Sequence, residues 1–218
     1  MTALPLGPTN GGARFPGFDV TSQAQHWDGR TRETVLARLR PLPHPRFFSE
    51  TEQHAASALF DQLLYQPEEP RVPVMNMVDA RIAAGETDGW HYQTMPPDAE
   101  AWRQTLAALD DDSTDRYGQV FAECSWDEQS DLLRAIHELG TELWHGMSAQ
   151  QVWSLWTRYA CTAFYSHPLA WNEIGFDGPA YPRGYKNLGV DRLEGIEVHD
   201  AHPADPIRHD DARGGAGR

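Results

Sequence analysis

The sequence has only two cysteines, Cys124 and Cys161, in 218 residues. Neither belongs to a C-x-x-C or C-x-x-C-H pattern, so the sequence offers no disulfide framework, no cysteine-based metal cluster and no site of covalent haem attachment. Each cysteine lies in or next to a helical pattern, where a thiol usually behaves as a small apolar group. We therefore expect both side chains to be buried.

Basic residues and long apolar runs are also scarce. There are 18 Lys and Arg against 32 Asp and Glu, which gives a formal net charge of -14 and argues against nucleic acids and anionic membrane surfaces as partners. No apolar stretch approaches the roughly 18 to 20 residues of a membrane-spanning helix. The first residues, MTALPLGPTNGGARFPGF, have neither a signal-peptide pattern nor a twin-arginine pair. We expect a protein that is cytoplasmic as synthesised.

Motifs for common chemistries are missing. The sequence contains no G-x-G-x-x-G, no G-x-x-x-x-G-K-[ST], no G-x-S-x-G and no H-E-x-x-H. The ten histidines do not follow metal-ligand spacing, and three of them, His199, His202 and His209, lie in a polar C-terminal segment. We therefore expect no catalytic, cofactor-binding or metal-binding residues in this chain.

Apolar residues recur at helical spacing in five segments between residues 49 and 164. SETE at 49–52 and SWDE at 125–128 are capping boxes, in which a serine hydroxyl and a glutamate each bond the other's backbone N–H, and SAQQ at 148–151 is a glutamine variant. No segment shows the alternation of a sheet. We predict a mainly α fold, a single helical domain of about five core helices, which begin at Ser49, after Pro73, near Pro97 or Asp98, at Ser125 and after Ser148.

The ends of two of these helices allow further predictions. Asp110, Asp111 and Asp112 would be unfavourable at the negative end of a helix dipole, so we expect them in a solvated turn after the third helix. They lack the ligand spacing of a calcium loop. The fifth helix is apolar around most of its circumference and must be covered by other helices or by another chain. His167 follows it, and we expect this side chain to cap its C-terminus.

The flanking regions differ in composition from the helical segments. Residues 1–46 are rich in proline around one short helix, TRETVLARLR, for which Thr31 is the expected cap. Beyond residue 191 the chain loses most of its apolar residues. We therefore predict an N-terminal arm (1–46), a helical domain (47–190) that includes a long aromatic Gly/Pro-rich loop, and a flexible polar tail (191–218).

The aromatic content of the expected loops stands out. AWNEIGFDGPAYPRGY, residues 170–185, alternates aromatic rings with turn-forming glycines and stiffening prolines. Aromatic residues and Arg dominate the energetic centres of protein interfaces, and a stiff loop loses less entropy on docking. The pattern favours a binding surface over a reaction centre. The candidate contact residues are Trp90, Tyr92, Trp171, Asn172, Glu173, Phe176, Tyr181, Arg183 and Tyr185.

Several segments resemble the gluconate 2-dehydrogenase subunit 3 family: PRFFSETEQ, PVMNMVDARIAAG, DGWHYQTMPP, AWRQTLAALD and SHPLAWNEIGFDGPAYPRGY. The resemblance covers roughly residues 45–190. It implies an all-helical small (gamma) subunit that binds an FAD-containing catalytic subunit of the glucose-methanol-choline (GMC) type and assists its folding, flavin loading or export. FAD is then expected in the partner and no cofactor in this chain. Many family members carry a twin-arginine signal that this sequence lacks, so the complex would be periplasmic only if a signal-bearing partner exports it.

Two alternatives remain open at the level of sequence. One is a small independent enzyme with a His/carboxylate or metal site, for which His91 with Asp88 and His145 with Glu142 are the candidate pairs. The other is a homo-oligomeric structural protein that associates through the fifth helix.

Overall fold

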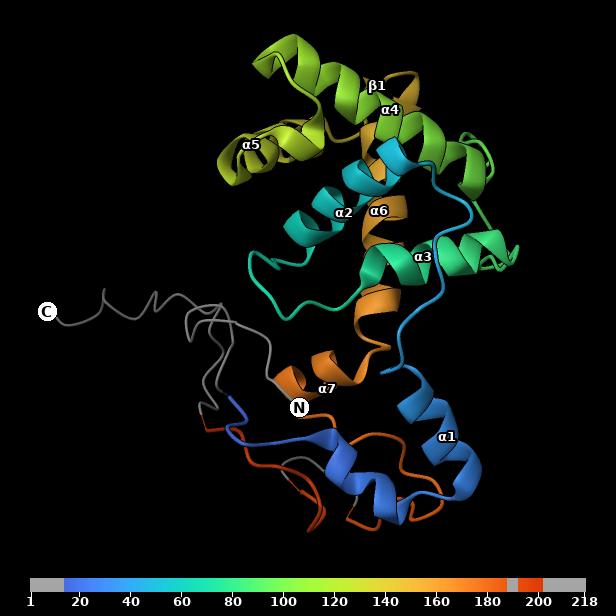
Figure 1. The fold of residues 1–218 in the computed structure, drawn as a ribbon, viewed down its shortest axis with the longest axis vertical. Coiled ribbons are helices and arrows are strands. Elements are labelled where there is room, and N and C mark those ends of the chain that lie inside the picture. Colours follow the sequence, from blue (N-terminus) through green and yellow to red (C-terminus); the bar gives the residue numbers. More distant parts are fainter. Residues whose placement is uncertain (1–13, 188–191, 202–218) are drawn as a thin grey trace, which may run out of the picture. The chain divides into compact units, whose positions relative to one another are not determined.

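The computed structural model describes residues 14–187 and 192–201. Its contacts group the described residues into two compact units: unit 1 contains those up to Arg40, Glu68–Pro70 and those from Ser166 onward, and unit 2 contains Pro41–Pro67 and Arg71–Tyr165. The predicted mainly α class is confirmed (Figure 1). The predicted boundaries at residues 46 and 190 stay a prediction, and the contact-based units, which divide the described chain near residues 40 and 166, do not test them. Much of the predicted arm and tail, 1–13 and 202–218, lies outside the described residues.

Unit 2 contains the five predicted core helices, a short 3-10 helix and a minimal hairpin. Helix α6 contacts α2, α3, α4 and α5, and Figure 1 shows these helices crossing it at different levels. The elements are α2 (Glu50–Leu63), α3 (Val74–Ala83), α4 (Asp98–Tyr117), η3 (Phe121–Glu123), α5 (Trp126–Glu138), β1 (Leu143–Trp144), β2 (Met147–Ser148) and α6 (Ala149–Phe164).

Both predicted glutamate capping boxes are confirmed. The backbone N–H of Ser49 donates to Glu52 at 2.7 Å, and that of Ser125 donates to Glu128 at 2.8 Å. The predicted box at Ser148 is wrong, because this side chain makes no capping hydrogen bond. The segment that leads into the β1–β2 hairpin supplies backbone acceptors instead: Ala149 N–H donates to the Glu142 carbonyl at 2.9 Å and Gln150 N–H to the Gly140 carbonyl at 2.7 Å. These carbonyls satisfy amides at the start of α6 that a cap would otherwise have to reach.

The predicted end of the third helix is also wrong. Helix α4 continues through Asp110, Asp111 and Asp112 to Tyr117 and ends at Gly118, whose φ is 77°. Two of the carboxylates find donors that are distant in sequence. Asp110 accepts from Phe121 N–H at 3.0 Å, and Asp112 accepts from the Trp144 indole at 2.7 Å. These contacts, together with the five helical residues that follow Asp112, offset the unfavourable interaction with the helix dipole that predicted an earlier end.

Aromatic rings from four segments meet in the interior of unit 2. Trp102 on α4 is fully buried, and its ring lies 5.3 Å from Phe60, 5.7 Å from Tyr159 and 6.1 Å from Phe48, between ring centroids. Each pair is tilted or edge-to-face, the geometry that aromatic quadrupoles favour. Most apolar residues of α6 are buried against this core, so the helices of its own unit provide the cover that the sequence required.

The two cysteines differ in exposure. Cys124 is buried, as predicted, with its thiol directed at the Val120 carbonyl 3.6 Å away. Cys161 is exposed, so the prediction for this residue is wrong. It lies on α6 next to Thr162, which is also exposed, on the side of the helix that faces away from the buried residues Tyr159, Ala160 and Ala163.

A buried carboxylate on α3 organises the chain before α2. Asp79 is 1% exposed and accepts three backbone N–H groups, from Arg46 at 2.7 Å and from Phe47 and Phe48 at 2.8 Å. The segment at 46–48 is irregular, so its amides have no helical acceptors. A single ionised side chain therefore replaces the hydrogen bonds that secondary structure would provide.

Replacing Asp79 with Ala should destabilise unit 2 strongly, because three backbone donors would lose their acceptor in the interior. We expect the free energy of unfolding to fall by about 3 kcal/mol or more. Urea denaturation followed by far-UV circular dichroism measures it. Asp131→Ala is the matched control, because Asp131 bonds only the exposed Arg134, and it should change stability by no more than about 0.5 kcal/mol. An equal effect of the two substitutions would contradict the role of Asp79.

Unit 1 is built from short helices around a small apolar cluster. Its elements are η2 (Val20–His26), α1 (Gly29–Ala37) and α7 (Pro168–Ile174). Val20, Trp27, Val35 and Trp171 form the cluster, which joins residues from both ends of the chain. Helix α1 begins earlier than predicted: Asp28, not Thr31, is the cap, and its carboxylate accepts from Thr31 N–H at 2.8 Å.

None of the helices within 14–187 and 192–201 combines the length and the hydropathy needed to cross a bilayer.

Candidate partner-binding surfaces

Trp171 and Asn172 lie in α7, although the sequence predicted a loop here. Trp171 is 5% exposed and Asn172 6%, so both side chains belong to the interior of unit 1. The Asn172 amide oxygen accepts from Val20 N–H at 2.8 Å, and the Trp171 ring lies 5.1 Å from Phe176 and 5.6 Å from the Arg38 guanidinium carbon. The glycines and prolines in this segment predicted a loop, but they lie at the two ends of a two-turn helix: Pro168 is its first residue and Gly175 caps its end after Ile174.

The remaining candidates of unit 1 are divided between surface and interior. Tyr181 is 65% exposed, and Phe176 and Tyr185 are also exposed, while Glu173 is half-buried. Arg183 points into the unit: it donates to Gln23 at 3.1 Å and lies 3.6 Å from the buried carboxylate of Asp177. Burial raises the pKa of Asp177, and the charge of Arg183 opposes this rise. Arg183 therefore orders the loop around Asp177.

Gly178 holds this loop close to the cluster of unit 1. Its φ is 83°, and a β-carbon at this position would lie 2.5 Å from the ring of Trp27, which is itself buried. Only glycine satisfies both conditions. Gly178, the first glycine of the GPAYPRGY segment, thus allows the backbone to contact the indole of Trp27.

Gly178→Ala should destabilise unit 1 by about 3 kcal/mol, because it combines a left-handed backbone with overpacking against Trp27. Gly184→Ala is the control: its φ is 71° but the space around it is open, so the cost should be only about 1 kcal/mol. Thermal unfolding monitored by tryptophan fluorescence compares them. Equal melting temperatures for the two variants would refute the close packing at Gly178.

His167 caps the start of α7, not the end of the preceding helix as predicted. Its Nδ1 accepts from Leu169 N–H at 3.2 Å, which requires an unprotonated nitrogen. Burial lowers the pKa of His167; the charge of Arg38 lowers it further, and a hydrogen bond with the Arg38 backbone opposes this. The guanidinium of Arg38 also donates to the Ser166 carbonyl at 2.7 Å. Helix α1 is thereby fixed to the start of α7 within unit 1.

The lowered pKa of His167 predicts an acid-sensitive unit 1. The unfolded chain takes up a proton near pH 6.5 and the folded chain only at lower pH, so the contribution to stability is complete above about 6.5 and declines as the pH falls through the folded-state pKa. His167→Asn keeps a neutral cap and should remove this component. Urea denaturation between about pH 8 and 5 measures the difference. An unchanged pH dependence in the variant would contradict it.

Trp90 and Tyr92 lie, as predicted, in a loop, which here joins α3 to α4 in unit 2. Trp90 is 49% exposed and Tyr92 37%, and their rings pack edge-to-face with centroids 5.3 Å apart. The guanidinium carbon of Arg158, on α6, lies 4.5 Å from the Trp90 ring centroid. The sequence did not predict a role for Arg158, because an arginine within an apolar helix does not indicate which loop its side chain contacts.

The two His/carboxylate pairs of the enzyme alternative are not brought together. Asp88 pairs with Arg81 and with Arg158, and no hydrogen bond joins it to His91 in the described part of the chain. His145 pairs with Asp112, at 2.8 Å, instead of Glu142. Within the described ranges, no group of three or more His, Cys, Asp or Glu is arranged to hold a metal ion.

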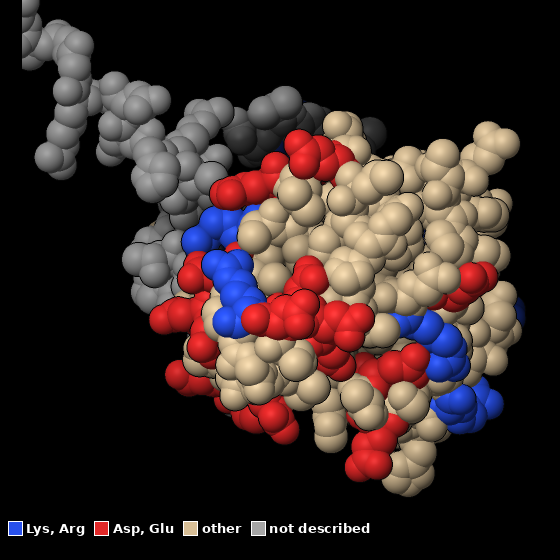
Figure 2. Space-filling view, turned by 90° about the horizontal axis from the view of Figure 1, so that it is seen from above, with Lys and Arg blue, Asp and Glu red and all other residues tan. Residues whose placement is uncertain are grey.

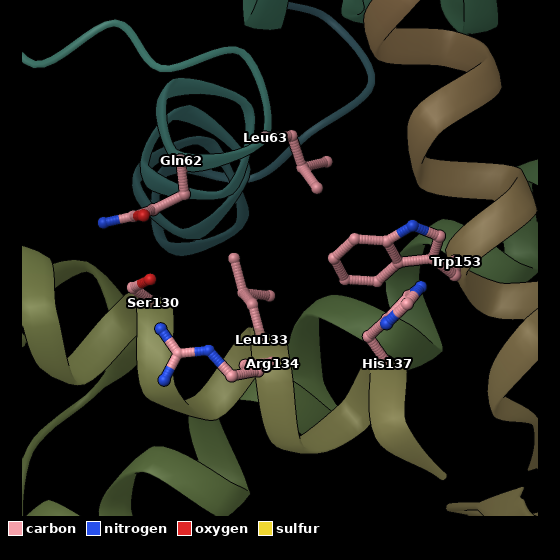
Figure 3. Close-up of a pocket in the computed structure, with 7 residues that line it drawn as sticks. All are labelled: Gln62, Leu63, Ser130, Leu133, Arg134, His137 and Trp153. Carbon is pink, nitrogen blue, oxygen red and sulfur yellow. The ribbon is translucent and has the colours of Figure 1, made fainter. Parts of the chain in front are cut away.

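A pocket of about 290 Å³ opens between α2 and α5 in unit 2 (Figure 3). Leu63 and Leu133 provide apolar walls, and the His137 ring lies against Trp153 with centroids 4.7 Å apart. Arg134 already pairs with Asp131 at 2.9 Å, so its charge is matched within the chain. The pocket is shallow and of mixed polarity, and it holds no convergent set of catalytic groups. Its lining also includes Gln62 and Ser130.

The fold and these surfaces define a mainly helical protein, and most of the exposed aromatic residues in its described part lie in two loops. The sequence model of one family, Gluconate 2-dehydrogenase subunit 3, matches residues 50–178. Because the match covers more than half of the chain, the chain belongs to this family, as the resemblance implied. No curated protein and no solved structure matches the chain.

Proposed function

We propose that the chain is the non-catalytic small subunit of an FAD-dependent sugar or alcohol dehydrogenase or oxidase, and that it binds and stabilises the flavoprotein of GMC type that carries the active site. The observation that carries this proposal is the family match over residues 50–178, since the family is named as a subunit of gluconate 2-dehydrogenase. A subunit needs a surface for its partner. The exposed rings of Trp90, Tyr92, Phe176, Tyr181 and Tyr185 supply candidate surfaces.

In this proposal the chemistry belongs to the partner. Oxidation of a CH–OH group transfers a hydride to FAD, which the catalytic subunit holds. The small subunit contributes binding and assists folding or flavin loading. We propose that it acts in the cytoplasm, and in the periplasm only where a signal on the partner exports the complex.

Co-expression with a GMC-type flavoprotein from the same genome tests the proposal. We expect the two chains to elute as one complex in size-exclusion chromatography with multi-angle light scattering. We also expect the flavoprotein to show a higher yield and a higher FAD-to-protein ratio, from flavin absorbance, than when it is expressed alone. A purified small subunit that has no affinity for such partners would refute the proposal.

The isolated chain provides the comparison with the enzyme alternative. It should neither turn over sugars or alcohols nor contain stoichiometric metal by elemental analysis. Turnover without a flavoprotein would instead support an independent enzyme. Self-association measured by light scattering addresses the homo-oligomer, for which the buried apolar face of α6 gives no support.

A further inference from the structure

We propose that one anchor in unit 2, the aromatic pair Trp90–Tyr92, carries most of the binding energy for the partner, and that Arg158 is the positioning residue that fixes this anchor. The inference rests on the proposed function. The occupant we assign is an uncharged apolar cleft on the flavin-containing catalytic subunit, with a hydrogen-bond acceptor for the indole N–H of Trp90.

The anchor is tied to α6 at several points. The Trp90 and Tyr92 rings meet at an interplanar angle of 87°. The Tyr92 hydroxyl lies 3.3 Å from the Ser154 hydroxyl, and Thr94 donates to the Gln151 amide oxygen at 2.8 Å. The loop therefore has contacts with α6 at Tyr92 and just after it, although it belongs to no helix or strand.

Beneath Trp90 lies a network of ionised side chains. Arg158 donates to Asp98 at 3.1 Å and lies 3.2 Å from Asp88, while Arg81 bonds the other oxygen of Asp88. The hydroxyl of Tyr159 donates to Asp98 at 2.8 Å. The four charged side chains are between 7% and 22% exposed. Asp88 is only two residues from Trp90, so the network fixes the start of the anchor loop as well as the guanidinium below the ring.

Such a network is a costly way to stabilise a fold. Removing each ion from water carries a large desolvation penalty, and well-packed apolar residues often give equal or greater stability. What the network provides here is a fixed position for the Arg158 guanidinium. Two carboxylates hold the Arg158 guanidinium over the Trp90 ring, with its carbon 4.5 Å from the ring centroid, and this contact restricts the orientation of the indole. A ring that is already ordered avoids most of the entropy loss of immobilising a side chain on docking.

The charge distribution determines the kind of partner surface that fits. Asp and Glu lie over much of the face in Figure 2, and a broad neighbouring area has no charged side chain. The chain has a net charge of -14, so close approach of another acidic protein is opposed at most of the surface. Beneath Trp90, the charges of Arg81 and Arg158 offset those of Asp88 and Asp98, and Glu86 adds one negative charge near Arg81. The centre of the surface is therefore aromatic and carries little net charge, which suits an interface core.

Tyr65, another exposed aromatic residue of unit 2, lacks this contact with an arginine in the described part of the chain. Tyr65 is 46% exposed and packs edge-to-face on Trp126 with centroids 5.9 Å apart, so it resembles Trp90 in exposure and ring contact. It has no guanidinium stacked on its ring among the described contacts. Tyr65 thus provides a matched control for exposure without the ion network.

The test measures binding of the full-length chain to a purified GMC-type flavoprotein by biolayer interferometry. Trp90→Ala should weaken the complex by about 30-fold or more, mainly through faster dissociation, and Trp90→Phe should recover part of the loss. Tyr65→Asn, which tolerates the left-handed backbone at this residue (φ 50°), should bind as wild type. If the wild-type chain binds the flavoprotein and Trp90→Ala binds it equally well, the anchor is overturned and the proposed function stays intact.

Arg158→Lys tests positioning, because lysine keeps the charge between Asp88 and Asp98 but lacks the planar fork. We expect binding about 10-fold weaker and faster proteolysis at residues 84–97, with an unchanged far-UV spectrum. In the Trp90→Ala background the same substitution should cause no further loss of binding. Additive losses would overturn the positioning role. The absence of any complex with the wild-type chain would overturn the proposed function and, with it, this inference.

Discussion

The carboxylate of Asp98 is the constraint on which the arrangement around the anchor depends. It lies at the first position of α4, where the helix dipole favours a negative charge, and it is almost completely buried. Burial is acceptable only because Tyr159 and Arg158 donate to it. Both donors come from α6, so this one group links the two longest helices of unit 2. Arg158, once placed, also pairs with Asp88 and supports Trp90.

The helices were predictable where their signals are local. The capping boxes at Ser49 and Ser125 each involve two residues three positions apart, and both were confirmed. The failures have the opposite cause, because the deciding partner is distant in sequence. Asp112 stays helical where Trp144 supplies a donor, and Ser148 needs no side-chain bond because the carbonyls just before the hairpin reach the first amides of α6. Hydrogen-bond partners of this kind become visible only once the elements are packed.

The candidate contact residues also divide into those that the local sequence places correctly and those whose position depends on partners distant in sequence. The sequence indicated correctly that Trp90 and Tyr92 lie in a loop, and the structure leaves them exposed. Trp171 and Asn172 carried the same signals, but pairing with Arg38 and Val20 places them in the interior of unit 1. Arg158 had no signal, because its partners Asp88 and Asp98 are 70 and 60 residues away along the chain. Binding by the nine candidate residues stays a prediction.

The unequal cysteines have a practical consequence for work on this protein. The chain has two thiols, and only that of Cys161 reaches solvent. It lies on α6, three residues after Arg158, so the two positions are neighbours on the helix circumference. Burial of part of the side chain raises the pKa of Cys161, so little of the reactive thiolate is present at neutral pH. Labelling is therefore faster in mildly alkaline buffer than at neutral pH. A maleimide dye attached there would give a single-site optical label beside the charged network, without any engineered cysteine.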